Sequence, residues 1–443
     1  AYVDQTKEEP LIPNLPKPGK IKKEAHNAQW DATEFTLSNG VKVLVKTTKF
    51  KEDEILFNAT AIGGTSKLPD SNATDLKGME IILSQNGLGD YTYSDLQKYL
   101  SGKQVAVGIS FDDYVRKIQG HSTPKDLPTL MELIYMTFTN INITEDEFKA
   151  LQNQYAGILA NQENTPQFIF SRDLMKSLFA NPRRQMVTSE DILALNRDNI
   201  LKIAHDMTLN AADYDFVFVG NIDMDAIRPL LEQYIATLPA NAKKVNNKVE
   251  INPTLSIKDG KGIDSFTTKM ETPQTYVFFA QAGELPYSAK ERALASIAGQ
   301  VLGNRLLKTV REDMGAVYSI GASGSMSRFP GKNTVIQSSF PMKPEMKAEV
   351  LNVIDNEIAA MATNVTADEV NKCLEFMIKE AKEGKELNDE WLDAISNTRI
   401  NGVDIFNGNV EMLQGITPDD VMKFMKNLRK ADNYRIVVLD PAE

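Results

Sequence analysis

The sequence predicts an α+β fold of two tandem homologous domains, each a mostly antiparallel sheet with helices packed on one face. Strand-like runs occur in hairpins, and pairs of long helical stretches follow them without strict alternation of strand and helix. Segments of the first half also recur in the second half, about 220 positions later. A length of 443 residues suits a chain of more than one domain.

The internal repeat rests on three pairs of segments, and it is visible in the sequence alone. Their offsets are 222, 220 and 219 positions, which are too similar to be expected by chance. The pairs are 142–148 with 364–370, Pro124 with Pro344, and 213–220 with 432–439.

The N-terminal residues 1–27 are predicted to form a linker. They contain Pro10, Pro13, Pro16 and Pro18 among charged and polar residues, a composition typical of an extended chain. A linker at the very start, together with Ala1 in place of Met, indicates a piece of a longer protein.

The first domain is predicted over residues 28–245. Asn39-Gly40 forms a tight turn between strands at 34–37 and 41–45, and a polar stretch at 239–253 follows the last helix. Further strands are predicted at 55–62, 104–111, 116–120 and 215–219, and helices at 75–85, 93–100, 126–140, 144–163, 167–180, 188–195, 197–207 and 227–238.

The second domain is predicted over residues 255–443. Its strands are predicted at 263–270, 274–282, 317–320, 334–341 and 434–439, and its helices at 288–310, 344–361, 366–383, 389–400, 408–414 and 417–428.

Composition excludes several classes of function. A formal charge of −11, from 60 acidic and 49 basic residues, argues against nucleic acid as a partner, because phosphate contacts require a basic surface. The single cysteine, Cys373, excludes a disulfide within the chain and is predicted to be a core thiol. No apolar run has the length of a membrane span, so a soluble globular protein is expected.

The segment 302–325 is the most informative part of the chain. Its helical half carries Arg311 on the last turn, Gly315 ends the helix, and Tyr318 opens the predicted strand. A guanidinium and a phenol on the same side of a cleft could both donate hydrogen bonds to a carbonyl or an oxyanion. The alternative is structural, with the cation favoured by the helix dipole and the aromatic ring packed on a sheet.

This segment resembles the signature R-E-x-x-G-x-x-Y-S of pitrilysin-like zinc peptidases of the insulinase superfamily, which Arg311, Gly315, Tyr318 and Ser319 match. The resemblance implies two halves of two such domains each, joined by a linker like residues 1–27. It also implies that Arg311 and Tyr318 act at a zinc site on the other half. Arg305 and Ser319 are the candidates for binding the peptide substrate. Family habit and the apparent loss of a leader imply a periplasmic or cell-envelope location.

The zinc motif of that family, H-x-x-E-H, is absent from the equivalent helix. That helix, 75–85, reads DLKGMEIILSQ and has no histidine, although Glu80 could occupy the position of the general base. None of the three histidines (His26, His121 and His205) pairs with another at ligand spacing, and Glu163 downstream adds no convincing ligand. We therefore predict no metal or other cofactor in this chain and a zinc ion on a partner half.

The sequence supports two hypotheses of different classes. In the first, the chain is the C-terminal half of a zinc endopeptidase, inactive alone, which closes the peptide chamber and supplies Arg311 and Tyr318. Its partners would be the zinc-binding half, in the same polypeptide or a separate subunit, and a peptide substrate. In the second, the chain is a non-catalytic structural or peptide-binding subunit, as in the core proteins of respiratory complexes. The presence of both Arg311 and Tyr318 favours the first.

Overall fold

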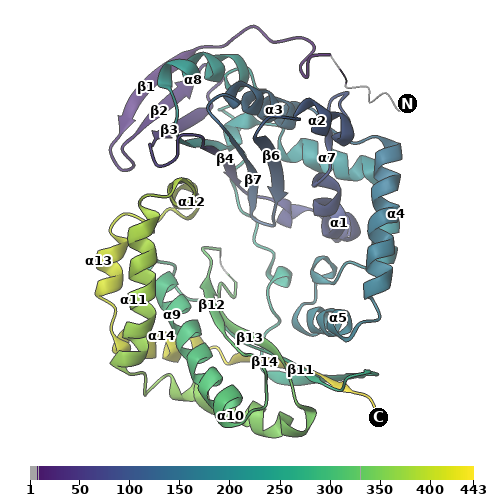
Figure 1. The fold of residues 1–443 in the computed structure, drawn as a ribbon, viewed down its shortest axis with the longest axis vertical. Coiled ribbons are helices and arrows are strands. Elements are labelled where there is room, and N and C mark those ends of the chain that lie inside the picture. Colours follow the sequence, from purple (N-terminus) through teal and green to yellow (C-terminus); the bar gives the residue numbers. More distant parts are fainter. Residues whose placement is uncertain (1–6, 8, 330) are drawn as a thin grey trace. The chain divides into compact units, whose positions relative to one another are not determined.

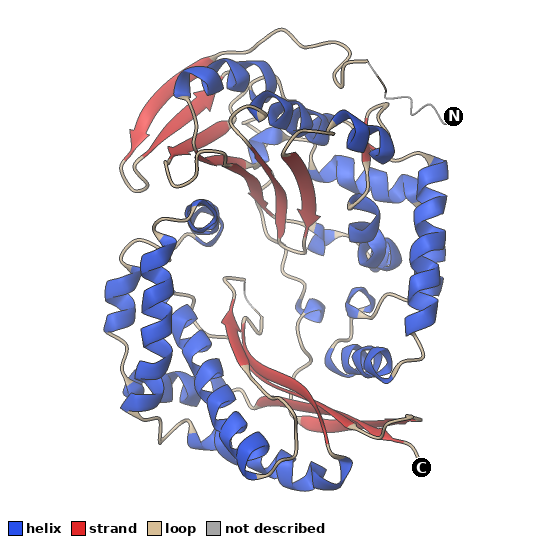
Figure 2. Cartoon of the chain, in the orientation of Figure 1, coloured by secondary structure: helices blue, strands red, loops and turns tan. Residues whose placement is uncertain are grey.

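The computed structural model describes residue 7, residues 9–329 and residues 331–443, which form two compact units (Figure 1). The first unit comprises the residues up to Ile158, Val187–Glu250 and Gly384–Asp404. The second comprises Leu159–Met186, Ile251–Glu383 and Ile405–Glu443. Each unit contains a mostly antiparallel sheet with helices, so the predicted α+β class is confirmed (Figure 2).

The first unit contains a seven-stranded sheet in the order β1-β2-β3-β9-β4-β7-β6. Only β3 and β9 pair in parallel within it. The predicted Asn-Gly turn is present, with Gly40 at φ +87°. The strands are β1 (Ile21–Asn27), β2 (Ala32–Leu37), β3 (Lys42–Thr47), β4 (Ile55–Ile62), β6 (Val105–Phe111), β7 (Val115–Ser122) and β9 (Asp215–Gly220); β5 (Gly87–Leu88) and β8 (Ile141–Asn142) form a small separate ladder.

Helices pack on one face of this sheet around a core that includes Phe57, Phe216, Ile134 and Leu231. Burial of such side chains is the main favourable term in folding. The helices are α1 (Ala73–Leu83), α2 (Tyr93–Tyr99), α3 (Leu127–Thr139), α4 (Glu145–Gln162), α6 (Ser189–Leu193), α7 (Arg197–Met207) and α8 (Met224–Leu230), which continues as the π-helix η5 (Leu231–Ile235).

The second unit contains a five-stranded sheet in the order β10-β14-β11-β13-β12. Its core joins Val277 and Phe279 of the sheet to Leu302 and Phe424 of the helices. The strands are β10 (Gly262–Thr268), β11 (Thr275–Gly283), β12 (Ser323–Met326), β13 (Thr334–Met342) and β14 (Asn433–Pro441), and the helices are α9 (Ala289–Leu306) with the π-helix η7 (Leu307–Asp313), α10 (Lys347–Ala360), α11 (Ala367–Gly384), α13 (Asn409–Gln414) and α14 (Pro418–Arg429).

The strand register shows the duplication directly. β9 lies between β3 and β4, and β14 lies between β10 and β11, so the segments 213–220 and 432–439 hold the same place in their sheets. The paired residues of the central strands differ by 220 positions between the two copies: Lys42–Asp215 and Gly262–Arg435, Leu56–Val219 and Tyr276–Leu439, and Ile55–Ser122 and Thr275–Met342.

The second face of each sheet carries a helix from the other half of the sequence. In the first unit, α12 (Asn388–Asn401) lies against β4 and β9 (Figure 1). In the second unit, α5 (Pro166–Leu178) lies against β10 and β14. Successive side chains of a strand point to opposite faces. Phe57 therefore enters the core of the first unit, while Asn58 donates a hydrogen bond to Ser396 of α12 at 3.3 Å.

Part of the predicted linker is built into the first unit. Leu11 and Ile12 are buried in its core, and Ile21–Asn27 pairs with β2 as the edge strand β1. A proline-rich chain is extended, and an extended segment can pair at a sheet edge after its last proline, because every later residue has a backbone N–H to donate.

The polar stretch predicted at 239–253 is also held by the first unit. The buried guanidinium of Arg116 donates to the carbonyl oxygens of Gly63 at 2.9 Å and Asn246 at 2.6 Å, and it pairs with Asp213 at 2.9 Å. The Ser66 hydroxyl donates to the Glu250 carbonyl at 2.7 Å. The chain therefore passes to the second unit after Glu250, within the predicted interdomain stretch.

In the part of the chain that the structure describes, none of the helices combines the length and apolar character that crossing a bilayer requires.

Candidate functional site

The candidate site lies on the second unit, where α9 ends. The Ser288 hydroxyl caps the start of α9 by accepting a hydrogen bond from the Glu291 amide at 3.0 Å. The helix widens into η7, whose last turn carries Arg311. Gly315 ends it with φ +61°, and its amide donates to the Arg311 carbonyl at 3.0 Å. Glycine adopts this left-handed conformation without steric cost, so the predicted helix end is confirmed.

Glycines hold the helix and the following strand at very short range. A Cβ atom on Gly299 of α9 would collide with the backbone of Gly324 of β12, and one on Gly324 would collide with the Ala295 carbonyl. One on Gly303 would lie 2.9 Å from the Ala322 amide nitrogen. These missing side chains allow backbone-to-backbone packing, which fixes the end of the connecting segment where β12 begins.

Arg311, Tyr318 and Ser319 are all exposed, and Tyr318 is 91% exposed. Among the described residues, none forms a hydrogen bond or ion pair with the side chains of Arg311 or Tyr318. Their neighbours Val310 and Ala316 are completely buried. The backbone beside both side chains is thus anchored, while the side chains themselves face solvent.

The prediction of a strand at 317–320 is wrong, because regular pairing begins only at Ser323. The Lys343 amide donates to the Ala316 carbonyl at 3.0 Å, and Ser323 pairs with Gln337. The six residues 317–322 therefore run beside the five residues 338–342, and one extra residue makes the segment bulge out of the sheet.

Arg305, predicted to bind substrate, is committed to contacts within the second unit. Its guanidinium forms a two-bond ion pair with Glu369, with nitrogen–oxygen distances of 2.7 and 2.9 Å, and donates to the Asn364 side chain at 2.9 Å. Hydrogen bonds from Arg305 lower the pKa of Glu369, and those same bonds raise the pKa of Arg305. The geometry supports a structural role for Arg305 in joining α9 to α11.

The residues of α1 do not fit a zinc site. The helix has no histidine or cysteine to bind zinc, and two of its charged side chains bind neighbouring helices. Asp75 accepts from Asn199 at 2.6 Å, and Lys77 pairs with Asp191 at 2.9 Å. Glu80 is exposed. Across residues 9–329 and 331–443 there is no group of three or more His, Cys, Asp or Glu side chains that could hold a metal ion.

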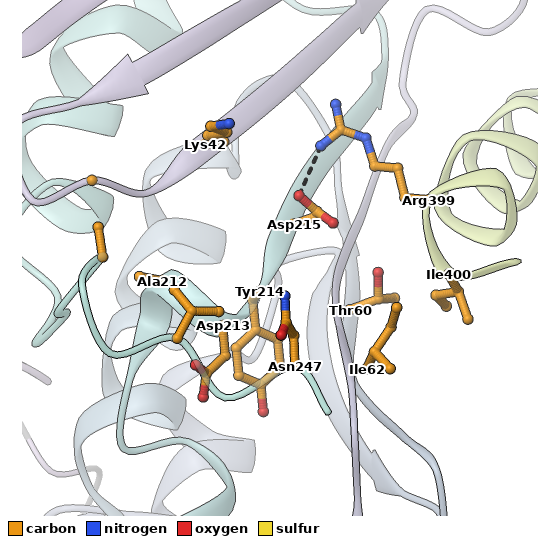
Figure 3. Close-up of a pocket in the computed structure, with 13 residues that line it drawn as sticks. Lys42, Thr60, Ile62, Ala212, Asp213, Tyr214, Asp215, Asn247, Arg399 and Ile400 are labelled. Atoms are coloured by element: carbon orange, nitrogen blue, oxygen red, sulfur yellow. Dashed lines mark hydrogen bonds and ion pairs between the residues drawn. The ribbon is translucent and has the colours of Figure 1, made fainter. Parts of the chain in front are cut away.

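A polar pocket of about 370 Å³ lies in the first unit, between the ends of β3, β4 and β9 and the end of α12 (Figure 3). Arg399 of α12 pairs there with Asp215 at 3.0 Å and with Glu34 at 2.9 Å. One cation thus pairs with two carboxylates, and these ion pairs attach α12 to the sheet. The pocket includes none of the predicted site residues.

Two tandem α+β copies, a helix α1 without a set of zinc ligands, and an arginine and a tyrosine exposed after α9 are the features that the resemblance to the non-metal-binding half of a pitrilysin-like peptidase implies. Comparison with known proteins agrees. Residues 194–377 match the family profile described as "Peptidase M16 inactive domain". The matched residues make up less than half of the chain, and they confirm the predicted resemblance to pitrilysin-like peptidases.

The relatives are zinc proteases of greater length. A zinc protease PQQL-like protein of Arabidopsis thaliana is 24% identical over 411 residues, which cover 87% of this chain and 39% of the relative. The probable zinc protease PqqL of Escherichia coli is 19% identical over 347 residues, which cover 77% of this chain and 36% of the relative. The chain thus spans less than two-fifths of these relatives.

Solved structures share the fold. The periplasmic protease PqqL from Escherichia coli matches with a TM-score of 0.82 and 19% identity, over 100% of this chain and 49% of that one. A peptidase M16 inactive domain from Pseudomonas fluorescens matches with a TM-score of 0.75 and 16% identity, over 93% of this chain and 99% of that one. The first half of PqqL also matches, with a TM-score of 0.66 and 12% identity over 94% of this chain and 93% of that one.

Proposed function

We propose that the chain is the C-terminal half of a zinc endopeptidase, closing a peptide chamber and supplying Arg311 and Tyr318 to the scissile carbonyl. The observation that carries the proposal is the state of these two side chains. Both are exposed, although the backbone around them is anchored by Val310, Ala316 and the glycine contacts of α9 with β12. A purely structural role would not require a tyrosine at this position, because an exposed side chain adds no packing to the fold.

The chemistry follows from the donors. The Arg311 guanidinium is always charged, and the Tyr318 hydroxyl can donate a single hydrogen bond. A tetrahedral intermediate places negative charge on the former carbonyl oxygen, so donors aimed at it bind the transition state more tightly than the ground state. Zinc, when bound on the other half, would supply the activated water; this chain would supply only hydrogen bonds and shape.

The partners in this proposal are a zinc-binding half and a peptide. This chain matches 49% of the solved PqqL chain and resembles the first half of PqqL as well, which supports pairing of two similar halves in one enzyme. PqqL from Escherichia coli is described as a periplasmic protease, and a periplasmic or cell-envelope location is proposed for this chain on that basis. Ser319, exposed beside Tyr318, is proposed to contact the peptide.

Tyr318→Phe tests the proposal, because it removes one hydroxyl from a 91% exposed side chain. In the assembled enzyme we expect turnover to fall by roughly ten- to a thousandfold, the range for loss of one transition-state donor, with little change in stability. The measurement is steady-state cleavage of a fluorogenic peptide.

Tyr155→Phe is the matched control. Tyr155 lies on α4 of the first unit, so the same loss of a hydroxyl there should leave turnover unchanged. If Tyr318→Phe assembled normally and cleaved peptides at the wild-type rate, the catalytic assignment would be wrong. The alternative of a structural or peptide-binding subunit would then be favoured.

A further inference from the structure

The bulged segment 317–322 faces a stretch of β13 that has no strand partner on that side. Regular pairing of β12 with β13 covers only Ser323–Met326. Within the described residues, no backbone hydrogen bond joins residues 317–322 to residues 338–342. The one contact there uses a side chain: the Ser338 hydroxyl donates to the Gly321 carbonyl.

The direction of the backbone groups in β13 follows from its contacts. In an antiparallel strand, alternate residues turn their N–H and C=O groups to opposite neighbours. The Lys343 amide points towards β12, since it donates to Ala316. The backbone groups of Pro341 and Ser339, two and four residues earlier, therefore point the same way, and β11 pairs with the groups between them. Proline has no N–H, so this edge lacks a donor at position 341.

That missing donor lies opposite the start of the site. Continuing the register of Ser323 with Gln337 would place Ser319 opposite Pro341. A regular strand would leave the Ser319 carbonyl without its donor. The chain leaves the sheet at this point, and Tyr318, next to Ser319, is 91% exposed. β-bulges redirect side chains in this way near active sites.

The first copy of the fold serves as an internal comparison. His121 occupies the position 220 residues before Pro341, and it has an N–H group. There the edge strand β6 pairs with β7 without interruption from Val105 opposite Ser122 to Phe111 opposite Arg116. The first copy, in which His121 supplies the N–H donor, has the seven-residue edge strand β6. The second copy, with proline at this position, has the four-residue edge strand β12.

We propose that Pro341 is a positioning residue for Tyr318: by withholding a backbone donor, it keeps residues 317–322 out of the sheet and the phenol exposed. This inference rests on the proposed function of Tyr318. Pro341 itself is exposed, so replacing it does not disturb the core.

The test is Pro341→His, which restores the donor found in the first copy, with Pro341→Thr as a second variant because any non-proline residue supplies the N–H. We expect β12 to extend to Ser319, so that hydrogen–deuterium exchange of the Ser319 and Gly321 amides slows by tenfold or more. Peptide turnover of the assembled enzyme should fall about tenfold with KM unchanged. Ser339→Thr is the matched control, since it raises strand propensity without adding a donor.

Two readouts separate this inference from the proposed function. If exchange in 317–322 is the same in both Pro341 variants as in the wild type, Pro341 does not hold the segment out and the inference is wrong, whatever Tyr318→Phe shows. If exchange slows as expected and turnover stays normal, the positioning role is also wrong. Loss of activity in Tyr318→Phe alongside either result leaves the proposed function standing.

Discussion

Arg305 and Arg311 lie six positions apart on one continuous helix, yet their surroundings give them different roles. The Arg305 guanidinium is held by Glu369 at 2.7 Å, by Asn364 and, at 3.5 Å, by Glu357. Arg311 is exposed at the last turn. A charged group that already satisfies its hydrogen bonds has little to offer a ligand, whereas a free one does. For this reason the proposed catalytic role falls to Arg311 and not to Arg305.

The Arg305–Glu369 pair predicts a pH dependence of stability. Because hydrogen bonds from Arg305 lower the pKa of Glu369 below its ordinary value of 4.5, the folded protein binds this proton less readily than the unfolded chain. The resulting stabilisation is complete above pH 4.5 and is lost as pH falls through the folded pKa. We expect Glu369→Gln to flatten this acid-side loss in melting temperature. Glu380→Gln, on an exposed position of α11, should keep the wild-type slope; equal slopes for all three proteins would contradict the prediction.

The sequence could predict the site only in part, and the reason is visible at single residues. Arg311, Gly315 and Tyr318 are neighbours in sequence, so local spacing and the helix-ending glycine were enough to place them. The partner of Arg305, by contrast, lies 64 positions away on another helix. Residue type alone could not distinguish a free arginine from a paired one. Pro341 was missed as well, although a proline inside a predicted strand is a signal of an incomplete edge.

At the scale of elements, the contact between α9 and β12 determines where the site segment lies. Small residues on both elements let the two backbones touch, and a larger residue on either would separate them. The long periodic helices were predicted within a few residues, for example 144–163 for α4 and 366–383 for α11. The short strand at 317–320 failed because an extra residue and a missing proline donor, neither of which affects local β-propensity, prevent pairing there.

Gly324→Ala tests the contact. Its Cβ atom would collide with the Ala295 carbonyl, which belongs to a helix backbone and cannot rotate away. We expect a loss of about 1–3 kcal/mol in the free energy of unfolding, the usual cost of overpacking. Gly321→Ala is the control, since nothing lies within 4 Å of its added atom. Denaturant unfolding followed by circular dichroism would measure both, and equal midpoints would show that the close contact is not required.

At the scale of the whole molecule, each unit is completed by a helix from the other half of the sequence. Trp391 of α12 packs edge-on against Trp30 at 6.5 Å between ring centroids. The Lys46 ammonium lies 4.3 Å from the centre of the Trp391 ring, and burial lowers its pKa. Periodicity predicted that 389–400 is a helix, but it contains no information on which sheet the helix packs against. The sequence therefore could not predict that each unit is completed by a helix from the other half of the chain.

Trp391→Ala tests whether α12 packs on the first unit. The substitution lies in the second half of the sequence, yet we expect it to cost about 2 kcal/mol and to raise hydrogen exchange in β2 and β3 of the first unit, because packing against Trp30 and Lys46 is lost. Phe376→Ala, at a 59% exposed position of α11, should change neither. Increased exchange confined to β11 and β13 after Trp391→Ala would contradict the assignment of α12 to the first unit.

The constant offset of 220 positions in the central strand pairs has an evolutionary consequence. Between β4 and β7 the first copy has two separate α-helices of 11 and seven residues, whereas the second has one continuous helix of 18 α-helical and seven π-helical residues between β11 and β13. The spacing of the flanking strands is nevertheless identical. The helices between the central strands thus differ in number and length between the two copies, while the number of residues between those strands is the same. Divergence after the duplication changed the local structure of this interval without changing the length of the coding segment.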